Sequence, residues 1–461
     1  MKKQFFYAAM ALAVMSSCSK DNDPGIGNPE ENNDKAVIAL GLDVPTVTAS
    51  TRGTGSVGDV AGDQNTWNSQ KLYIYMVDRN TGLEAEEGAE NAKTKILDNG
   101  VLEFRAPKAD AKDKGAIRIY KSYTEDSDNG VIQYKYYPTN GQYTFYGYHI
   151  DDAANANPSI TATEKKVTGV TIDGTQDLLA AKTIDMAEND ATAADPESFY
   201  KDIATSLGSE WTELMKYQFG ARTARKGIVP VLKFEHQLAR LKFFVRAGSA
   251  SAAGYEWQTS QWVERKSSDA AAKPLGMQVT KITLKDMANV VDMDLTVPSS
   301  TRNGAGVADF VVCSKDAAAN NKLDPTKGLI DPVVPKYPYE DANIPAQDPD
   351  TKGTQVGEPV MFFPIDDPDN GNITLSIDLK QYVEDTKDEA TGTITYKEVE
   401  KADNKLIIDQ SKISGATKKF MPGASYNVYI TIYGLEKIEV TAVLTAWENG
   451  GDIDADIEDG K

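Results

Sequence analysis

The chain has 461 residues and a net charge of −20, with 69 acidic and 49 basic side chains. This length allows two or three domains, and the negative charge argues against nucleic acid as a partner because phosphates require a basic patch. Tyrosine (21) outnumbers phenylalanine (13), and threonine and valine recur in short alternating runs, which is typical of β-rich proteins.

The first eighteen residues have the pattern of a bacterial lipoprotein signal. Lys2 and Lys3 precede an apolar run from Phe5 to Met15 that is too short to span a bilayer, and small residues lead to Cys18. Such signals place at this position the cysteine that receives the lipid, whose acyl chains supply roughly 0.8 kcal/mol per buried CH₂ for membrane attachment. An ordinary cleaved secretory signal is the alternative. We predict a signal at 1–18, lipidation at Cys18 and export from the cytoplasm.

A first strand is predicted after a polar tether at 19–35, whose composition is typical of disorder. Within 36–44 every second residue is apolar, which predicts a strand with one buried face. The alternating residues are Ile38, Leu40, Leu42 and Val44. A polar loop at 46–64 follows and contains Arg52 and a GxGxxG string at 53–58; since neither a strand nor a helix flanks this string, we predict no dinucleotide site there.

Alternating segments then recur along the chain, separated by Gly, Asn and Asp clusters, which favours a sandwich or barrel. One stretch, 196–219, changes period: its apolar residues are spaced as on one face of an amphipathic helix, and we expect that helix to cap a sandwich. The long stretch 316–353 shows little alternation and is predicted to be a surface excursion. The strands expected in this part of the chain are 72–77, 101–104, 116–120, 131–136, 143–148, 231–234, 240–245, 277–284, 293–297, 360–363, 373–377 and 394–396, and the helical stripe is Ile203, Leu207, Trp211 and Leu214.

The last part of the chain has the most regular alternation. A strand is predicted at 426–432, and a second one follows Gly434. The alternating residues of this second strand are Ile438, Val440, Ala442, Leu444 and Ala446.

No catalytic constellation is visible. His149 and His236 lie far apart in the sequence without a partner at metal-ligand spacing, and the Asp-rich segments 126–130, 366–371 and 452–456 do not fit a twelve-residue calcium loop. Asp-Gly and Asn-Gly between strands favour hairpin turns. We expect no enzyme activity, no cofactor and no metal, a hydrogen-bonded structural role for His236, and a structural ion pair for Arg240.

Four segments carry a resemblance to one family. They are Phe234-Glu-His236-Gln-Leu-Ala239-Arg240-Leu241, the alternating aromatics of 141–148, Thr175-Gln176-Asp177-Leu178-Leu179-Ala180, and Met421-Pro422-Gly423 followed by Tyr426. In this order, and together with the lipoprotein signal, they resemble the Bacteroidetes fimbrillin superfamily, the subunits of donor-strand (type V) pili.

The resemblance implies a mainly β fold with two transthyretin-like β-sandwich domains and a few short helices. It also implies cleavage after an arginine in the first long loop, and Arg52 is the first arginine of the chain, so the mature protein would begin at Gly53. The expected division is a signal at 1–18, a propeptide at 19–52, an N-terminal domain at 53–227, and a C-terminal domain at 228–461 with a donor strand at 435–447.

Loss of the first strand would uncover an apolar groove and open backbone groups, to which a foreign strand of matching period can add. The strand 438–446 has that period, although it could instead remain the last strand of its own sandwich. Exchange would give a filament, because a head-to-tail contact does not close on itself.

The resemblance also implies partners and a location. The partners are other copies of the chain, an arginine-specific protease, fimbrial anchor and tip subunits, and the outer membrane through the precursor's lipid. The location is the fimbrium on the cell surface, with a role in adhesion and biofilm.

Two further interpretations remain open. One is a fimbrial anchor or tip protein that keeps its lipid. The other is a permanently lipidated outer-membrane surface protein, such as a glycan-binding module in which Trp257 and Trp262 offer stacking platforms.

Overall fold

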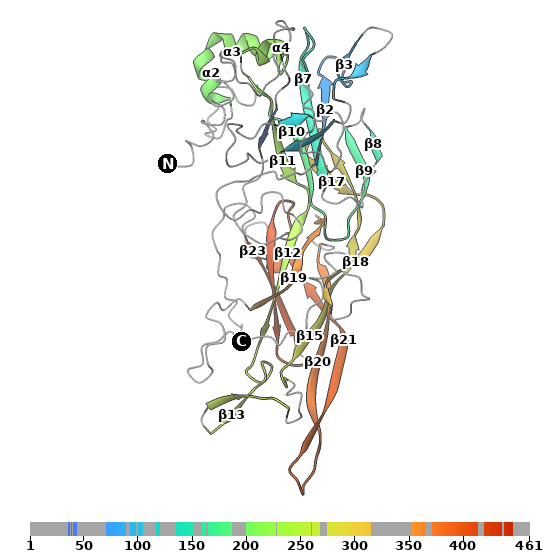
Figure 1. Ribbon diagram of the computed structural model, residues 1–461, viewed down its shortest axis with the longest axis vertical. Coiled ribbons are helices and arrows are strands. Elements are labelled where there is room, and N and C mark those ends of the chain that lie inside the picture. The colour runs from blue at the N-terminus through green and yellow to red at the C-terminus, as the bar shows by residue number, and fades with distance from the viewer. Residues whose placement is uncertain are drawn as a thin grey trace, which may run out of the picture.

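The protein is mainly β, with four larger sheets, two small hairpins and a few short helices (Figure 1). A computed structural model describes the following residues: 36, 38, 40–43, 71–88, 93–97, 100–104, 117–119, 135–150, 159–161, 165–186, 200–226, 228–259, 261–267, 274–314, 353–365, 371–413, 419–435 and 438–445.

The upper part of the molecule in Figure 1 contains a seven-stranded sheet. All of its neighbouring strands are antiparallel except β1 and β11, which pair in parallel. The strand order is β1 (Gly41–Asp43), β11 (Val231–His236), β10 (Leu178–Thr183), β7 (Tyr143–Ile150), β2 (Lys71–Asp78), β5 (Gly100–Phe104) and β6 (Ile117–Ile119).

Both faces of this sheet are buried, because alternate residues of its strands point into different clusters. On β10, Leu179 and Ala181 pack towards the helices, whereas Leu178 and Ala180 pack on the opposite face. The helices are α2 (Lys201–Leu207), α3 (Ser209–Leu214) and α4 (Ala221–Ala224), and Trp211, Leu214 and Ala221 are among their buried contributions.

A four-stranded sheet provides residues to the cluster on that opposite face. Its apolar residues, among them Val167 and Met293, join Tyr75 and Tyr148 of the seven-stranded sheet in one buried cluster. Its strand order is β17 (Ser299–Arg302), β16 (Val290–Asp294), β9 (Lys166–Thr171) and β8 (Ser159–Thr161). The small hairpin of β3 (Glu86–Glu87) and β4 (Thr94–Lys95) lies beside the upper sheet (Figure 1).

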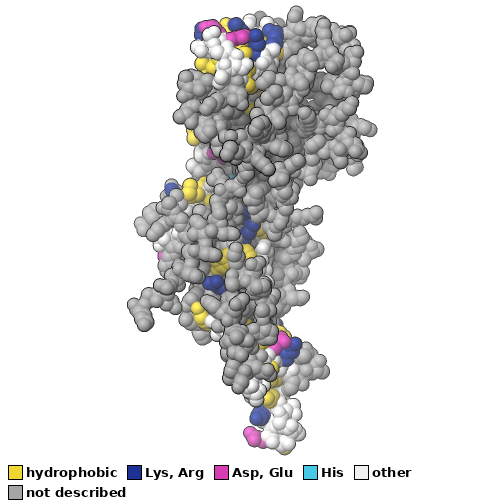
Figure 2. Space-filling model, turned by 90° about the vertical axis from the view of Figure 1, so that its left-hand side faces the viewer, with side chains coloured by type: hydrophobic (Ala, Val, Ile, Leu, Met, Phe, Trp, Pro, Cys, Tyr) yellow, Lys and Arg dark blue, Asp and Glu magenta, His cyan; other side chains and the backbone are white. Residues whose placement is uncertain are grey.

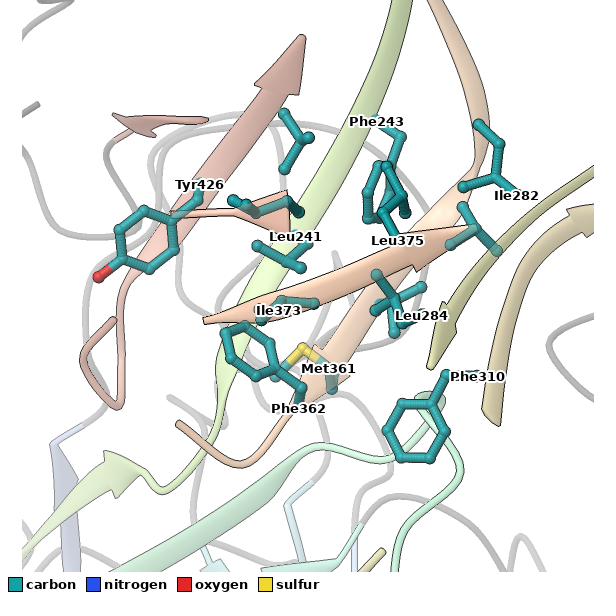
Figure 3. Packing of buried hydrophobic residues seen from close by; sticks show 14 of the residues in the cluster. Leu241, Phe243, Ile282, Leu284, Phe310, Met361, Phe362, Ile373, Leu375 and Tyr426 are labelled. Atoms are coloured by element: carbon teal, nitrogen blue, oxygen red, sulfur yellow. The ribbon is translucent and has the colours of Figure 1, made fainter. Parts of the chain in front are cut away.

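The lower part is a sandwich of two four-stranded sheets. The first has the order β19 (Thr354–Phe362), β12 (Ala239–Ala247), β22 (Ser425–Ile432) and β23 (Ile438–Thr445), and the second has the order β18 (Val307–Ser314), β15 (Gln278–Ala288), β20 (Ile373–Lys387) and β21 (Ile394–Ile408). Figure 3 shows their inward side chains meeting between the sheets, among them Leu241, Phe243, Ile282, Leu284, Phe310, Leu375 and Tyr426.

One continuous cluster joins the upper and lower parts, because residues of β2, β7, β9 and β10 share it with those of the lower sandwich. The chain crosses the junction at Gln237–Leu238, between β11 and β12. At the same level the amide of Met361 donates to the carbonyl of Gly174 at 2.9 Å, and a Cβ on Gly174 would lie 2.9 Å from Val360. The two parts therefore pack directly against each other.

The mainly β class, the sandwich packing and the few short helices confirm the predicted fold class. The expected domain boundary at 227 stays a prediction, but β11, which follows it directly, pairs with β10 of the upper sheet. In addition β16, which comes from the C-terminal half of the chain, pairs with β9. The chain therefore stays in the upper part beyond residue 227 and returns to it once more, with β16 and β17.

Some predicted elements differ from the structure. The single helix expected within 196–219 is broken at Gly208, which has a φ of 55° and separates α2 from α3. The strand expected at 293–297 lies instead at Val290–Asp294, because residues 295–298 form the turn of the β16–β17 hairpin and Val297 is exposed. The strands at 373–377 and 394–396 extend to 15 residues each. The excursion expected at 316–353 lies outside the described residues, except Gly353.

The packing of the lower sandwich leads to a first prediction. Leu284→Ala should lower the free energy of unfolding by about 2–5 kcal/mol, because Leu284 is fully buried opposite Phe310 and the substitution leaves a cavity. Denaturant unfolding measures this value. Val307→Ala, on the exposed end of the facing strand, is the matched control and should change stability by no more than about 0.5 kcal/mol; equal effects of the two substitutions would contradict the packing described.

Candidate strand-exchange site

The N-terminal segment is seated on the core of the upper part. The amide of Ile38 donates to the carbonyl of Lys135 at 2.8 Å, and the amide of Tyr137 donates to the carbonyl of Ala36 at 2.9 Å. Ala36 and Ile38 are buried, and Leu40 is partly buried against the same cluster. The segment is therefore held both by its backbone and by its apolar side chains.

The next residues form β1 at the edge of the seven-stranded sheet. Leu42 lies opposite Leu232 in parallel register, and Gly41 and Asp43 lie opposite Val231 and Lys233. Among the described strands, β11 has only β10 on its other side. If β1 leaves, the backbone N–H and C=O groups of β11 that face it lose their partners, and β11 becomes an open edge.

The side chains of the segment cover apolar residues of the sheet and helices. Ile38 belongs to the cluster that contains Leu232, Phe234 and Trp211. Burying Ile38 and half-burying Leu40 contributes on the order of 2–5 kcal/mol, at about 1.5–3 kcal/mol per fully buried aliphatic side chain. Removal of the segment would expose this apolar surface together with the open edge of β11.

The C-terminal strand β23 is also an edge strand. It pairs only with β22 among the described strands, in antiparallel register, and Ile438 and Val440 are half-buried against the central cluster. Residues Ile438, Val440, Ala442 and Leu444 lie opposite Ile432, Ile430, Val428 and Tyr426, all four of which are buried. In this structure β23 therefore completes the sheet of its own chain.

The two edge segments have the same period of two. Ile38, Leu40 and Leu42 in the first, and Ile438, Val440, Ala442 and Leu444 in the second, alternate with residues on the other face. Of the remaining predicted residues, Cys18, Val44, Arg52, Gly53 and Ala446 lie outside the described part of the chain, as do the segments 126–130 and 452–456.

A buried pair lies in the upper part of the molecule beside this site. The Nδ1 atom of His236, at the end of β11, lies 2.9 and 3.1 Å from the carboxylate oxygens of Asp177, and both side chains are almost completely buried. This confirms the structural role predicted for His236. Asp177 was not predicted as its partner from the sequence, although both residues stand in segments that carried the family resemblance.

Other polar residues predicted from the sequence are also buried at this level. Arg240 is completely buried, its Nε donates to the hydroxyl of Ser425 at 3.2 Å, and its amide donates to the carbonyl of Ala424 at 3.0 Å. His149 is buried on β7 opposite Leu179, which in turn lies opposite His236. The fold thus places two histidines that are distant in sequence in one row of the sheet, with Leu179 between them.

Within the described ranges, no group of three or more His, Cys, Asp or Glu residues is arranged to hold a metal ion. Cys313 is buried, and this burial raises the pKa of its thiol to about 12. No helix in the part of the chain that the structure describes is long and apolar enough to cross a membrane.

Comparisons with known proteins are of three kinds. No protein-family model matches the chain, and no curated protein matches it. Among solved structures, a Bacteroides uniformis protein provisionally assigned to cell adhesion is 12% identical, with a TM-score of 0.41 and coverage of 91% of this chain and 99% of that one. A fimbrial anchor protein of Porphyromonas gingivalis is 10% identical (TM-score 0.29; 89% and 98% covered). A fimbrial assembly protein of Parabacteroides distasonis is 9% identical (TM-score 0.27; 88% and 95% covered). The family resemblance therefore stays a prediction, and the function proposed below is argued from the strands themselves.

The buried pair gives a second prediction. Asp177→Leu should lower the free energy of unfolding by about 2–5 kcal/mol, because it leaves the imidazole of His236 buried without its acceptor. The double variant Asp177→Leu/His236→Phe should regain most of that loss, since neither polar partner remains. Denaturant unfolding measures the free energy of unfolding of the two variants. A double variant that is no more stable than the single variant would contradict the pairing.

Proposed function

We propose that this chain is a structural subunit of a cell-surface fimbria that polymerises by donor-strand exchange. The observation that carries the proposal is that its two ends supply edge strands: an N-terminal segment seated on the upper core and a C-terminal strand of the same period. The N-terminal segment can be lost and the C-terminal strand donated while the central strands of both sheets stay paired.

The precursor is a lipoprotein in this proposal. Cys18 carries the lipid that anchors it to the outer membrane, and the signal at 1–18 is removed. An arginine-specific protease then cuts after Arg52. Because this residue lies between β1 and β2, the cut separates the first strand from the chain that begins at Gly53. Once it is no longer tethered, the short first strand can leave the edge of β11.

The vacated edge accepts β23 of another subunit. The donated strand has eight residues, compared with three in β1, so it can form more backbone hydrogen bonds than the strand it replaces. Each subunit both accepts and donates, which suits a stalk subunit and gives an open filament. Anchor and tip subunits would close the two ends of this filament, which supports adhesion and biofilm formation.

A second candidate function is a permanently lipidated outer-membrane surface protein, either a fimbrial anchor or tip or a glycan-binding module. One observation favours the glycan-binding form. In the hairpin of β13 (Tyr255–Gln258) and β14 (Gln261–Glu264), the backbone register pairs Trp257 with Trp262. An acylated Cys18 on surface-purified protein would support this function, whereas an N-terminus at Gly53 supports the fimbrial subunit.

The third prediction concerns the cut. Arg52→Ala should leave a full-length, lipidated monomer in the outer membrane and abolish surface filaments, because the first strand stays tethered. Electron microscopy of the cell surface detects the filaments, and N-terminal sequencing of the purified subunit identifies the cleavage site. Arg302→Ala, an exposed arginine on β17, is the control and should leave processing unchanged. Normal processing of Arg52→Ala would place the cut elsewhere.

The fourth prediction concerns the donor strand. Val440→Asp combined with Leu444→Asp should stop polymerisation, because two charges would enter an apolar groove in the acceptor. The subunit should stay folded, because β23 is an edge strand and Val440 is only half-buried in its own chain. Circular dichroism checks the fold and electron microscopy checks filaments. Thr441→Asp/Val443→Asp, on the alternate positions of the same strand, is the matched control and should still polymerise. Filaments from the Val440/Leu444 variant would overturn the assignment of the donor strand.

A further inference from the structure

The longest hairpin of the protein extends beyond the sheet that carries it. Strand β15 pairs with β20 only as far as Lys380, whereas β20 continues to Lys387 and returns through β21 (Figure 1). We call residues 381–400 the arm. No other described strand pairs with β20 beyond Lys380 or with the outer edge of β21. Two strands alone are marginally stable in water, so an exposed arm of this length suggests a partner.

The arm combines apolar and charged side chains. Tyr382 and Tyr396 are partly buried on one face, opposite Glu398 and Glu384, and Val383 and Val399 are partly buried on the other face. Lys380 forms an ion pair with Glu398 at 3.1 Å and lies over the ring of Tyr382. These contacts are local to the hairpin and leave its end exposed.

The end of the arm is acidic. Residues 384–389 contain four carboxylates and one lysine, and all of these side chains are exposed. The amides of Ala390 and Thr391 donate to Asp388 at 2.8 and 3.2 Å, and these hydrogen bonds lower the pKa of its carboxyl group. Asp388 thus shapes the turn, whereas Glu384 and Glu389 are available at the surface.

A basic segment lies at the opposite end of the molecule, although the whole chain carries a net charge of −20. Residues 209–226, around α3 and α4, contain four basic and two acidic side chains, and Figure 2 shows Lys and Arg side chains gathered at this end. Lys216 and Lys226 pair with Glu213 and Glu210 at 2.8 and 2.7 Å. Arg222 and Arg225, in the same segment, are both exposed.

This basic segment also offers an aromatic surface. The guanidinium of Arg222 lies 4.7 Å from the ring centre of Tyr217, whose side chain is 39% exposed. Exposed Tyr and Arg side chains are the residue types that contribute most to protein–protein contacts. The helices thus present a stacked Tyr–Arg pair within a positive field.

We propose that the tip of the arm of one subunit docks on the helical end, around Tyr217, Arg222 and Arg225, of the next copy of the chain. The inference rests on the proposed filament, in which subunits follow one another head to tail. Along the longest axis of the molecule the helices and the arm lie at opposite ends (Figure 1), so the arm of one subunit would face the helices of the next. The partner is a second copy because the two surfaces have opposite charge and both stand at the ends of the same chain.

Docking of opposite charges steers the two subunits into register before strand exchange, and electrostatic steering raises association rates by about 10–10³-fold at low salt. It also explains why the helical end is basic in an acidic protein. The contact would weaken as salt increases, since the screening length falls from about 8 Å at 0.15 M to about 3 Å at 1 M.

The test compares charge-reversal variants of the full precursor, cleaved with an arginine-specific protease and followed by electron microscopy and light scattering. Glu384→Lys/Glu389→Lys and Arg222→Glu/Arg225→Glu should each slow polymerisation at low salt by about tenfold or more. The quadruple variant, which exchanges the charges, should recover to within about threefold of the wild-type rate. Arg302→Glu, a reversal on β17 away from both ends, should have no such effect.

Disulfide trapping gives an independent readout of the same contact. Glu389→Cys combined with Arg222→Cys should give a ladder of covalently linked subunits after oxidation of filaments. Glu389→Cys combined with Arg302→Cys should not. The native Cys313 does not compete, because it is buried.

The outcomes separate the two proposals. Wild-type filaments with no ladder, and with unchanged polymerisation of both reversal variants, would overturn the docking and leave the fimbrial function intact. A cleaved wild-type chain that never polymerises would overturn both. Binding of the arm to a basic surface other than a second copy would appear as a charge effect without a ladder, and would also contradict the proposed contact.

Discussion

The backbone of β11 is the constraint on which the rest of the account depends. Its amide and carbonyl groups need partners on both sides, and on one side, among the described strands, the short β1 alone provides them. The neighbouring segment adds Ile38 and Ala36 to the core, so the same few residues satisfy an edge and cover an apolar surface. A protein built this way is complete while its N-terminal segment stays in place and becomes a receptor for another strand when that segment leaves.

The rest of the fold is arranged so that this exchange does not disturb it. The core of the upper sheet continues into the lower sandwich, and the hydrogen bond and close contact at Gly174 connect the two parts. Loss of β1 at one edge and withdrawal of β23 at another leave these contacts intact.

Strand positions were predictable where burial alternates with a period of two. The strands β2, β7, β12 and β22 follow the predicted segments closely. One or both of their faces are packed, and this packing is visible in the sequence as apolar residues at regular positions. The arm was underestimated because its distal half carries polar residues on both faces, which removes the alternation. The break at Gly208 within the predicted helix depends on a backbone conformation rather than on the apolar stripe, which continues across it.

The candidate site was only partly predictable from the sequence. The period of Ile38–Leu42 and of Ile438–Leu444 indicated two strands with a buried face, but periodicity carries no information about neighbours, and the edge position of β1 depends on its pairing of Gly41 with Val231, 190 residues further along the chain. The partner of His236 could not be predicted for the same reason, since Asp177 lies 59 positions away.

The most direct measurement of the central claim is a cryo-electron microscopy structure of the native filament, examined at the edge of Val231–His236. The account predicts residues 438–445 of the neighbouring subunit beside that strand, whereas residues 41–43 of the same chain still paired there would contradict it.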